Sequence, residues 1–239
     1  MHLVSLKLIA ATAVFLVPIT AGAVPFILKK QDQSFAFAKG EAFACGIFLG
    51  AGLLHMLNHA LQDAIKVNFS SSTVLLCVGM TFLAMLLLEH ISRYFADHNR
   101  KFLPLLATAI LSIHSIAAGI ALGMAHSAET LMVVLVAILS HKWAAGFALA
   151  ILLAKHLKNV WPAYIAFSLM TPLGIFFGQS LLSWHNDDLS IYAHAIAAGS
   201  FLYIGTLHGL KQAVLVDRCC DLKTFVWLLL GFGCMSLIQ

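Results

Sequence analysis

Long apolar segments alternate with short polar joints along the whole sequence. The apolar segments span residues 6–28, 37–61, 72–92, 103–125, 129–154, 160–184, 190–213 and 222–238. Each is close to the ~20 apolar residues that an α-helix needs to cross a bilayer, and the seventh is the least apolar. The pattern predicts an all-α integral membrane protein with eight transmembrane helices in a single domain, residues 1–239.

The composition excludes most soluble classes of protein. Hydrophobic residues make up 61% of the chain and charged residues only 10%, whereas soluble domains carry roughly a quarter charged residues. The formal net charge of +4 is scattered between the apolar segments, which argues against a nucleic-acid partner. The five cysteines lack C-x-x-C spacing and predict no disulfide framework. The expected surroundings are a lipid bilayer.

The basic residues predict the orientation of the helices. With eight spans the two termini share one side of the membrane, and cytosolic joints carry an excess of Lys and Arg. One set of joints holds Lys29, Lys30, Lys39, Arg93, Arg100, Lys101, Lys155, Lys158, Lys211, Arg218 and Lys223. The other set holds only Lys7 and Lys66. We therefore expect a multi-pass protein of the cell membrane with both termini outside the cytosol.

The joints on the outward side carry acidic residues instead. These are Asp63, Glu129, Asp187 and Asp188. They either attract cations to that mouth of the bundle or belong to ordinary solvated loops, because acidic residues contribute little to topology.

Several histidines lie inside the predicted spans, where a titratable side chain is costly and normally faces the interior of the bundle. His114 and His141 fall near the middle of the fourth and fifth spans, and His55 and His59 share one face of the second. His208 falls roughly 9 Å to the cytosolic side of the centre, at ~1.5 Å rise per residue. For any one of them alone, a buried, hydrogen-bonded structural role is the better explanation. Five in series predict a path for a metal ion, because imidazole binds Zn, Cu, Fe and Ni.

The fourth and fifth spans share an internal repeat. His114-Ser-Ile-Ala-Ala-Gly-Ile-Ala-Leu in one corresponds to His141-Lys-Trp-Ala-Ala-Gly-Phe-Ala-Leu in the other. Consecutive spans run antiparallel, so a pseudo-two-fold axis in the membrane plane predicts that His114 faces His141, with the Ala-Ala-Gly runs allowing close helix approach. Beside them, Lys142 repels a second cation, loses its proton through desolvation, or turns away and donates to a carbonyl.

Five blocks of the predicted spans together form a recognisable pattern. They are Gly46 to His55 in the second span, His114 to Gly119 in the fourth, His141-Lys142 in the fifth, Ser168 to Gly174 in the sixth and Ala198 to Tyr203 in the seventh. In order and spacing these blocks resemble the ZIP (ZRT/IRT-like) family of divalent metal transporters. The resemblance implies a ZIP-like bundle with inverted three-helix repeats around helices 4 and 5. It also implies uptake of a metal ion into the cytosol.

The resemblance implies roles for individual residues as well. His114 and His141 fall at first-metal positions, and His55 falls at the outer approach. The implied second-metal positions are Ser115, Lys142 and Thr171. The implied pore position is Phe48.

The chain departs from the family pattern in its carboxylates. Ala118 and Ala145 stand where the family has Glu, and His59 and His208 stand where acidic residues are usual. A binuclear centre is therefore not expected. The sequence predicts a His-lined, mononuclear site near the midplane.

These observations predict a transporter whose substrate is a divalent transition metal, with zinc first and iron, manganese, copper or cadmium as alternatives. A competing hypothesis is a transport-deficient ZIP homologue that acts as a metal sensor or partner subunit. A homodimer is one arrangement that the sequence leaves open. An enzyme is disfavoured, because the histidines are spread through the depth of the bilayer and no G-x-S-x-G nucleophile pattern is present.

Overall fold

The computed structural model describes residues 2–28, 34–96, 102–181, 187–208 and 222–237, and every regular element in these ranges is helical. The elements are α1 (His2–Leu28), α2 (Ser34–Gly50), η2 (Ala51–Met56), α3 (Leu57–Lys66), α4 (Ser71–Ala96), α5 (Phe102–Gly123), α6 (Ala128–His156), α7 (Trp161–Leu181), α8 (Asp187–Tyr203), η4 (Ile204–His208) and α10 (Leu222–Ser236). Seven stretches of the described residues are long and apolar enough to cross a membrane, and Thr224–Ser236 is a shorter apolar helix. The predicted all-helical, multi-pass fold is confirmed.

Two of the spans contain a π-helical turn. α2, η2 and α3 form one continuous span, and α8 continues into η4 in the same way. η2 carries His55, and His208 is the last residue of η4. π-turns are rare and occur frequently at functional sites, so their presence draws attention to these two spans. The predicted end of the seventh span, residue 213, lies outside the described residues.

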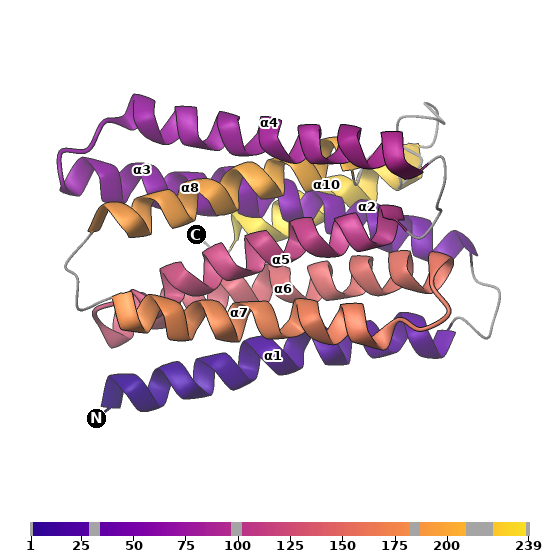
Figure 1. Cartoon of the computed structure of the whole chain (residues 1–239), viewed down its shortest axis with the longest axis horizontal. Coiled ribbons are helices and arrows are strands. Elements are labelled where there is room, and N and C mark those ends of the chain that lie inside the picture. The colour runs from indigo at the N-terminus through magenta and orange to yellow at the C-terminus, as the bar shows by residue number, and fades with distance from the viewer. Residues whose placement is uncertain (1, 29–33, 97–101, 182–186, 209–221, 238–239) are drawn as a thin grey trace.

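The most extensive helix contacts obey an inverted symmetry. α5 packs along α7 and α1 along α6, while α10 packs along α2 and α4 along α8 (Figure 1). An inverted repeat exchanges α1 with α7, the α2–α3 span with the α8 span, α4 with α10, and α5 with α6. This exchange converts the α5–α7 contact into the α6–α1 contact. It also converts the α10–α2 contact into the α4–α8 contact. The same exchange relates the two spans that carry π-turns. These relations support the predicted inverted three-helix repeats around α5 and α6.

Glycines allow the closest helix contacts. A Cβ atom on Gly119 of α5 would lie 2.9 Å from Gly174 Cα of α7, and one on Gly123 would lie 3.0 Å from Gly178 Cα. In each helix the two glycines are four residues apart and share one face. Gly146 of α6 lies equally close to α1. The glycines of the Ala-Ala-Gly repeat therefore serve contacts with α7 and α1, the symmetry-related outer partners.

Two helices present leucine-rich surfaces to the outside of the bundle. The exposed apolar side chains include Leu75, Leu76, Met80, Leu83 and Leu87 on α4, and Leu229 and Leu230 on α10. Such surfaces are unfavourable in water and suit the hydrocarbon of a bilayer. They agree with the expectation that lipid surrounds this chain.

One end of the bundle, here called the N-terminal face, carries the start of α1 and the turns at residues 67–70 and 124–127 (left in Figure 1). Lys7, which the sequence places among the joints at this end, instead lies inside α1 and is only 3% exposed. Its ammonium donates hydrogen bonds to the Gly123 carbonyl oxygen at 2.6 Å and to Gln179 Oε1 at 2.5 Å. A buried ammonium needs such partners, and this one ties α1 to the ends of α5 and α7.

Candidate metal centre

Two imidazoles meet in the interior of the bundle, about halfway along α5 and α6. The ring centroids of His114 and His141 lie 5.7 Å apart, and the residues are 3% and 1% exposed. The internal repeat predicts this juxtaposition, and the structure has it. Titratable side chains are costly at this depth, so a buried pair is a candidate functional site.

A hydrogen-bond network from α8 fixes how the His114 ring is presented. His114 Nδ1 lies 3.0 Å from Ser200 Oγ and 3.2 Å from the Ala197 carbonyl oxygen. The Ser200 hydroxyl donates its own hydrogen to that carbonyl, at 2.8 Å. Both oxygens therefore act as acceptors, and Nδ1 carries the proton. His114 then presents the lone pair of Nε2, which is buried and has no partner among the described residues.

His141 is less constrained. Neither of its ring nitrogens has a hydrogen-bond partner in the part of the chain that the structure describes. An unsatisfied buried polar atom costs about 1–3 kcal/mol and is rare in folded proteins, so several at one place point to a ligand. The free nitrogens of the two histidines are suitable ligands for a transition metal.

An aromatic wall from α8 borders the pair. Phe201 stacks on His114, with centroids 3.5 Å apart and rings inclined by 24°. Phe201 also meets the His141 ring edge-on, with centroids 4.6 Å apart. Phe48 of α2 packs against Phe201, with centroids 5.4 Å apart. Both phenylalanines are fully buried. The implied pore position Phe48 thus belongs to an apolar layer whose main member, Phe201, is absent from the predicted site.

Lys142 is turned toward α5 and α7. Its ammonium donates to Ser115 Oγ at 2.8 Å and to Thr171 Oγ1 at 2.7 Å, and lies 4.2 Å from the centre of the Phe167 ring. The acceptors are hydroxyls and not the carbonyl that one expectation assumed. Ser115 and Thr171 are the residues implied for a second metal, so a second ion would have to displace the ammonium. Its charge opposes that displacement.

Small apolar residues follow both histidines. Ala118 and Ala145 lie one turn beyond His114 and His141, and each is 2% exposed. Within residues 2–28, 34–96, 102–181, 187–208 and 222–237, no three His, Cys, Asp or Glu side chains already converge as a group that could hold a metal ion. The pair therefore offers two protein ligands, and water has to complete the coordination of any ion bound there.

Further imidazoles continue from this pair toward the N-terminal face. The rings of His55 and His59 lie 4.5 Å apart, and His59 stacks on His194 at 5.9 Å. His194 comes from α8 and is missing from the predicted site; its only signal in the sequence is a polar residue in the least apolar span. The side chain of His208, at the other end of the predicted series, lies outside the described part of the chain.

Comparison with known proteins identifies the family. The family model of the ZIP zinc transporters matches residues 4–104 and 98–239, nearly the whole chain. This chain belongs to the ZIP zinc transporter family. ZIP is a family of transporters and not of enzymes, which confirms that part of the sequence-based prediction.

Relatives of this ZIP member include zinc transporter ZIP1 from two vertebrates. The chain is 32% identical to ZIP1 of Takifugu rubripes over 159 residues, 63% of this chain and 51% of that relative. It is 35% identical to ZIP1 of Homo sapiens over 133 residues, 53% of this chain and 40% of that relative. The chain thus spans about half the length of these relatives or less. Its match to zinc transporter ZIP2 of Mus musculus is weaker, at 24% identity, but covers 82% of each chain.

The remaining residues of this ZIP site that sequence reasoning missed lie on α8. Ser200 and Phe201 fall inside the Ala198–Tyr203 block that carries the family resemblance, yet nothing in their local pattern distinguishes them from core residues. Their importance depends on where α8 approaches α5, which only the three-dimensional arrangement provides.

Proposed function

We propose that this ZIP member transports a divalent transition metal ion, with zinc first, through a mononuclear site at His114 and His141. The observation that carries the proposal is the buried pair of imidazoles whose free nitrogens have no partner among the described residues. Imidazole suits Zn, Cu, Fe and Ni better than Mg or Ca. The ZIP1 relatives are named zinc transporters, which favours zinc among these ions. The ion is the substrate of the path.

Weak binding at this pair is compatible with transport. Two neutral imidazoles do not offset a charge of 2+, and the Lys142 ammonium adds further positive charge nearby. A conducting path requires sites that an ion both enters and leaves, and several moderate sites serve this better than one tight site. We assign His55 and His59 to the approach from the N-terminal face and His208 to the continuation toward the opposite face.

The inverted repeats provide a route for conformational change. Transporters with such repeats commonly alternate access by rocking one group of helices against another around a fixed midplane site. Here the layer of Phe48 and Phe201 packs against the histidine pair and has to move for an ion to pass. We propose that this layer is part of the gate.

We also propose that both termini lie outside the cytosol, so that transport toward the cytosol runs from the N-terminal face to the opposite face. The excess of Lys and Arg in the joints at the opposite face supports this orientation. Ser70 and Asn159 are exposed at the two faces. In intact cells a membrane-impermeant maleimide should label Ser70→Cys, and should label Asn159→Cys only after lysis, with the parent chain as control for native cysteines. The reverse pattern would overturn the direction.

The assignment of the centre is tested by metal flux into liposomes that contain the purified chain. Replacing both His114 and His141 with Ala should abolish zinc flux, because the midplane ligands are lost. His90→Ala, at an exposed position of α4, is the matched control and should leave flux unchanged. Undiminished flux in the double variant contradicts the proposal. Zinc binding without any flux in the parent chain would favour the transport-deficient homologue instead.

A further inference from the structure

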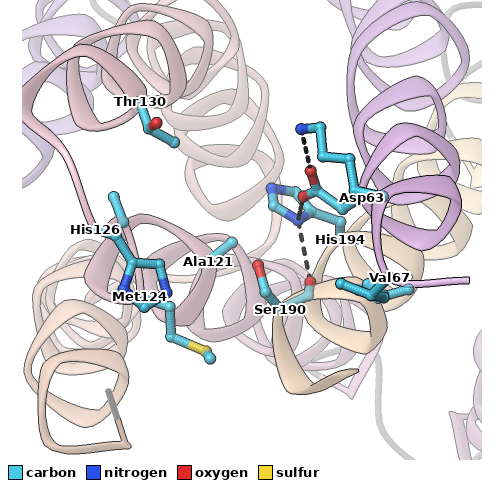
Figure 2. A pocket seen from close by; sticks show the side chains of 11 residues that line it. Asp63, Val67, Ala121, Met124, His126, Thr130, Ser190 and His194 are labelled. Atoms are coloured by element: carbon cyan, nitrogen blue, oxygen red, sulfur yellow. Dashed lines mark hydrogen bonds and ion pairs between the residues drawn. The ribbon is translucent and has the colours of Figure 1, made fainter. Parts of the chain in front are cut away.

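A cavity of about 270 Å³ opens at the N-terminal face, away from the midplane pair. It lies between the end of α3, the start of α8 and the turn that joins α5 to α6 (Figure 2). Its polar lining includes Asp63, Lys66, His126, Thr130, Ser190 and His194. Three of these, Asp63, His126 and His194, are of kinds that zinc commonly takes as ligands, and Asp63 and His194 lie on facing helices.

One ring nitrogen of His194 makes a hydrogen bond, and the other is available to bind a metal ion. The residue is 4% exposed, and Nδ1 lies 3.0 Å from the Ser190 carbonyl oxygen. A carbonyl only accepts hydrogen bonds, so Nδ1 carries the proton and Nε2 bears the lone pair. Nε2 is buried and has no partner in the described part of the chain. In Figure 2 this nitrogen points away from Ser190 toward the open centre of the cavity.

Partners for an ion at this nitrogen are close by on the opposite helix. The His59 ring stacks on His194 with centroids 5.9 Å apart, and Asp63 Oδ2 lies 4.0 Å from His194 Nδ1. His59 and Asp63 are four residues apart on α3 and share one face. Both are partly exposed, so their side chains can turn toward a bound ion.

We propose that His194, His59 and Asp63 form a second binding site for a divalent transition metal ion, at the entrance and separate from His114 and His141. The donor atoms do not converge on one point in the empty cavity, so the ion is held in an open coordination shell completed by water. Two imidazoles and one carboxylate with an open position are a common zinc ligand set. The site therefore binds an ion and can also release it.

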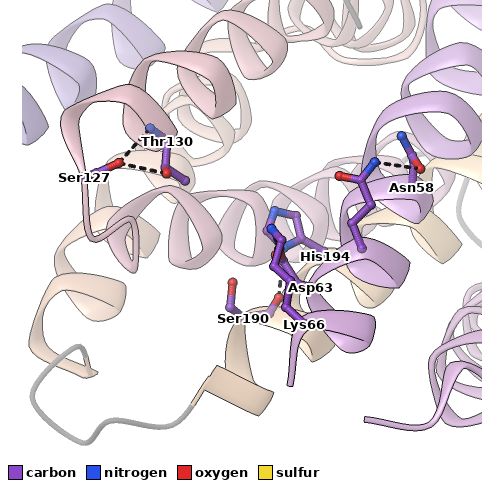
Figure 3. Close-up of polar contacts among 8 residues, drawn as sticks. Asn58, Asp63, Lys66, Ser127, Thr130, Ser190 and His194 are labelled. Atoms are coloured by element: carbon purple, nitrogen blue, oxygen red, sulfur yellow. Dashed lines mark hydrogen bonds and ion pairs between the residues drawn. The ribbon is translucent and has the colours of Figure 1, made fainter. Parts of the chain in front are cut away.

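The Lys66 ammonium competes with a metal ion for the Asp63 carboxylate. This ammonium lies 2.9 Å from Asp63 Oδ1, and the Lys66 side chain is 69% exposed (Figure 3). An ion that recruits the Asp63 carboxylate has to displace this ammonium, which can swing into solvent at little cost. Removing Lys66 should therefore tighten metal binding, whereas a purely structural Asp63–His194 contact predicts no such effect.

The test uses the full chain in lipid nanodiscs and zinc alone as the probe. In the His114→Ala, His141→Ala background, equilibrium dialysis should still find one bound Zn²⁺ per chain. Adding His194→Gln should remove it, and adding Asp63→Asn should weaken it about tenfold, as loss of a ligand or its support does. Adding Lys66→Ala should strengthen it. The exposed His90→Ala serves as the matched control and should change nothing.

Each outcome bears on this proposal alone. Absence of bound zinc in the double-alanine background overturns it, as do equal zinc affinities with and without Asp63→Asn and Lys66→Ala. Lys66 is exposed and Asp63 is partly exposed, so these two variants keep the test valid if His194→Gln folds poorly. The proposal does not rest on transport, because a chain without flux would still bind zinc at the entrance. Conversely, loss of flux in the double variant with no entrance binding would support the transport centre and overturn only the entrance site.

Discussion

The ammonium of Lys142 donates a hydrogen bond to Ser115 Oγ across the interface between α5 and α6, at 2.8 Å. Ser115 follows His114 and Lys142 follows His141, so the internal repeat brings equivalent positions of two antiparallel helices together. The same ammonium donates to Thr171 of α7. A tethered cation therefore occupies the polar space next to the proposed path of the metal ion.

Replacing Lys142 with Met should strengthen zinc binding at the midplane pair several-fold, because a positive charge beside the ion is removed. It should also lower the free energy of unfolding by about 1–3 kcal/mol, because the buried Ser115 and Thr171 hydroxyls lose their donor. Zinc dialysis and thermal unfolding of the same nanodisc samples measure both effects. The exposed Lys158→Met is the control. Equal zinc affinity in Lys142→Met and the parent chain would contradict the repulsive role.

A carboxylate at position 118 should convert the weak centre into a tighter one. Ala118 lies four residues after His114 and on the same helix face, so a Glu there reaches toward an ion on His114 Nε2. Zinc affinity should rise by about tenfold or more, and zinc flux should slow as release becomes limiting.

The matched control is Ala118→Gln, which adds the same volume to this buried position without the charge. Dialysis with Zn²⁺ compares the two variants directly, since both carry the same packing cost. If Ala118→Glu and Ala118→Gln bind zinc equally, the missing negative charge is not what weakens this centre.

Gly119→Ala should destabilise the bundle by about 1–3 kcal/mol, because the new Cβ lies 2.9 Å from Gly174 Cα and must push α5 away from α7. Gly79→Ala on α4 is the natural control, since nothing lies within 4 Å of its Cβ. Alanine favours a helix over glycine by about 1 kcal/mol, so that variant should be neutral or slightly stabilised. Thermal unfolding in micelles measures both, and equal melting temperatures would exclude the close α5–α7 contact.

The helices and the central pair are predictable because their signals are local or repeated. Hydropathy alone delimits the spans, and the repeat containing His114 and His141 encodes the symmetry that places them together. Family resemblance adds Ser115 and Thr171, and the structure finds both at the Lys142 ammonium.

Features that depend on which helices touch are not predictable in this way. Phe201 and Ser200 contact His114 only because α8 packs beside α5, and His194 meets His59 for a similar reason. The predicted position of Lys7 in a joint was wrong. Its charge suggests a joint between spans, but a carbonyl at the end of α5 and a glutamine on α7 satisfy the ammonium inside the bundle.

Ser200 provides a test of how the first ligand is oriented. Ser200→Ala removes the nearer acceptor of His114 Nδ1–H and leaves only the Ala197 carbonyl at 3.2 Å. Because such supporting hydrogen bonds fix the tautomer and direction of a metal-binding imidazole, zinc affinity should fall about tenfold. Dialysis in the His194→Gln background isolates the midplane pair, and nitrogen NMR of labelled histidine reports which ring nitrogen carries the proton.

Ser180→Ala is the matched control for this change. Its hydroxyl also donates to backbone carbonyls of its own helix, those of Phe176 and Phe177, but it lies at an exposed position of α7. It should leave both the affinity and the His114 signal unchanged. A parent chain in which His114 carries its proton on Nε2 would reverse the argument, because that nitrogen could not then bind the ion without losing the proton.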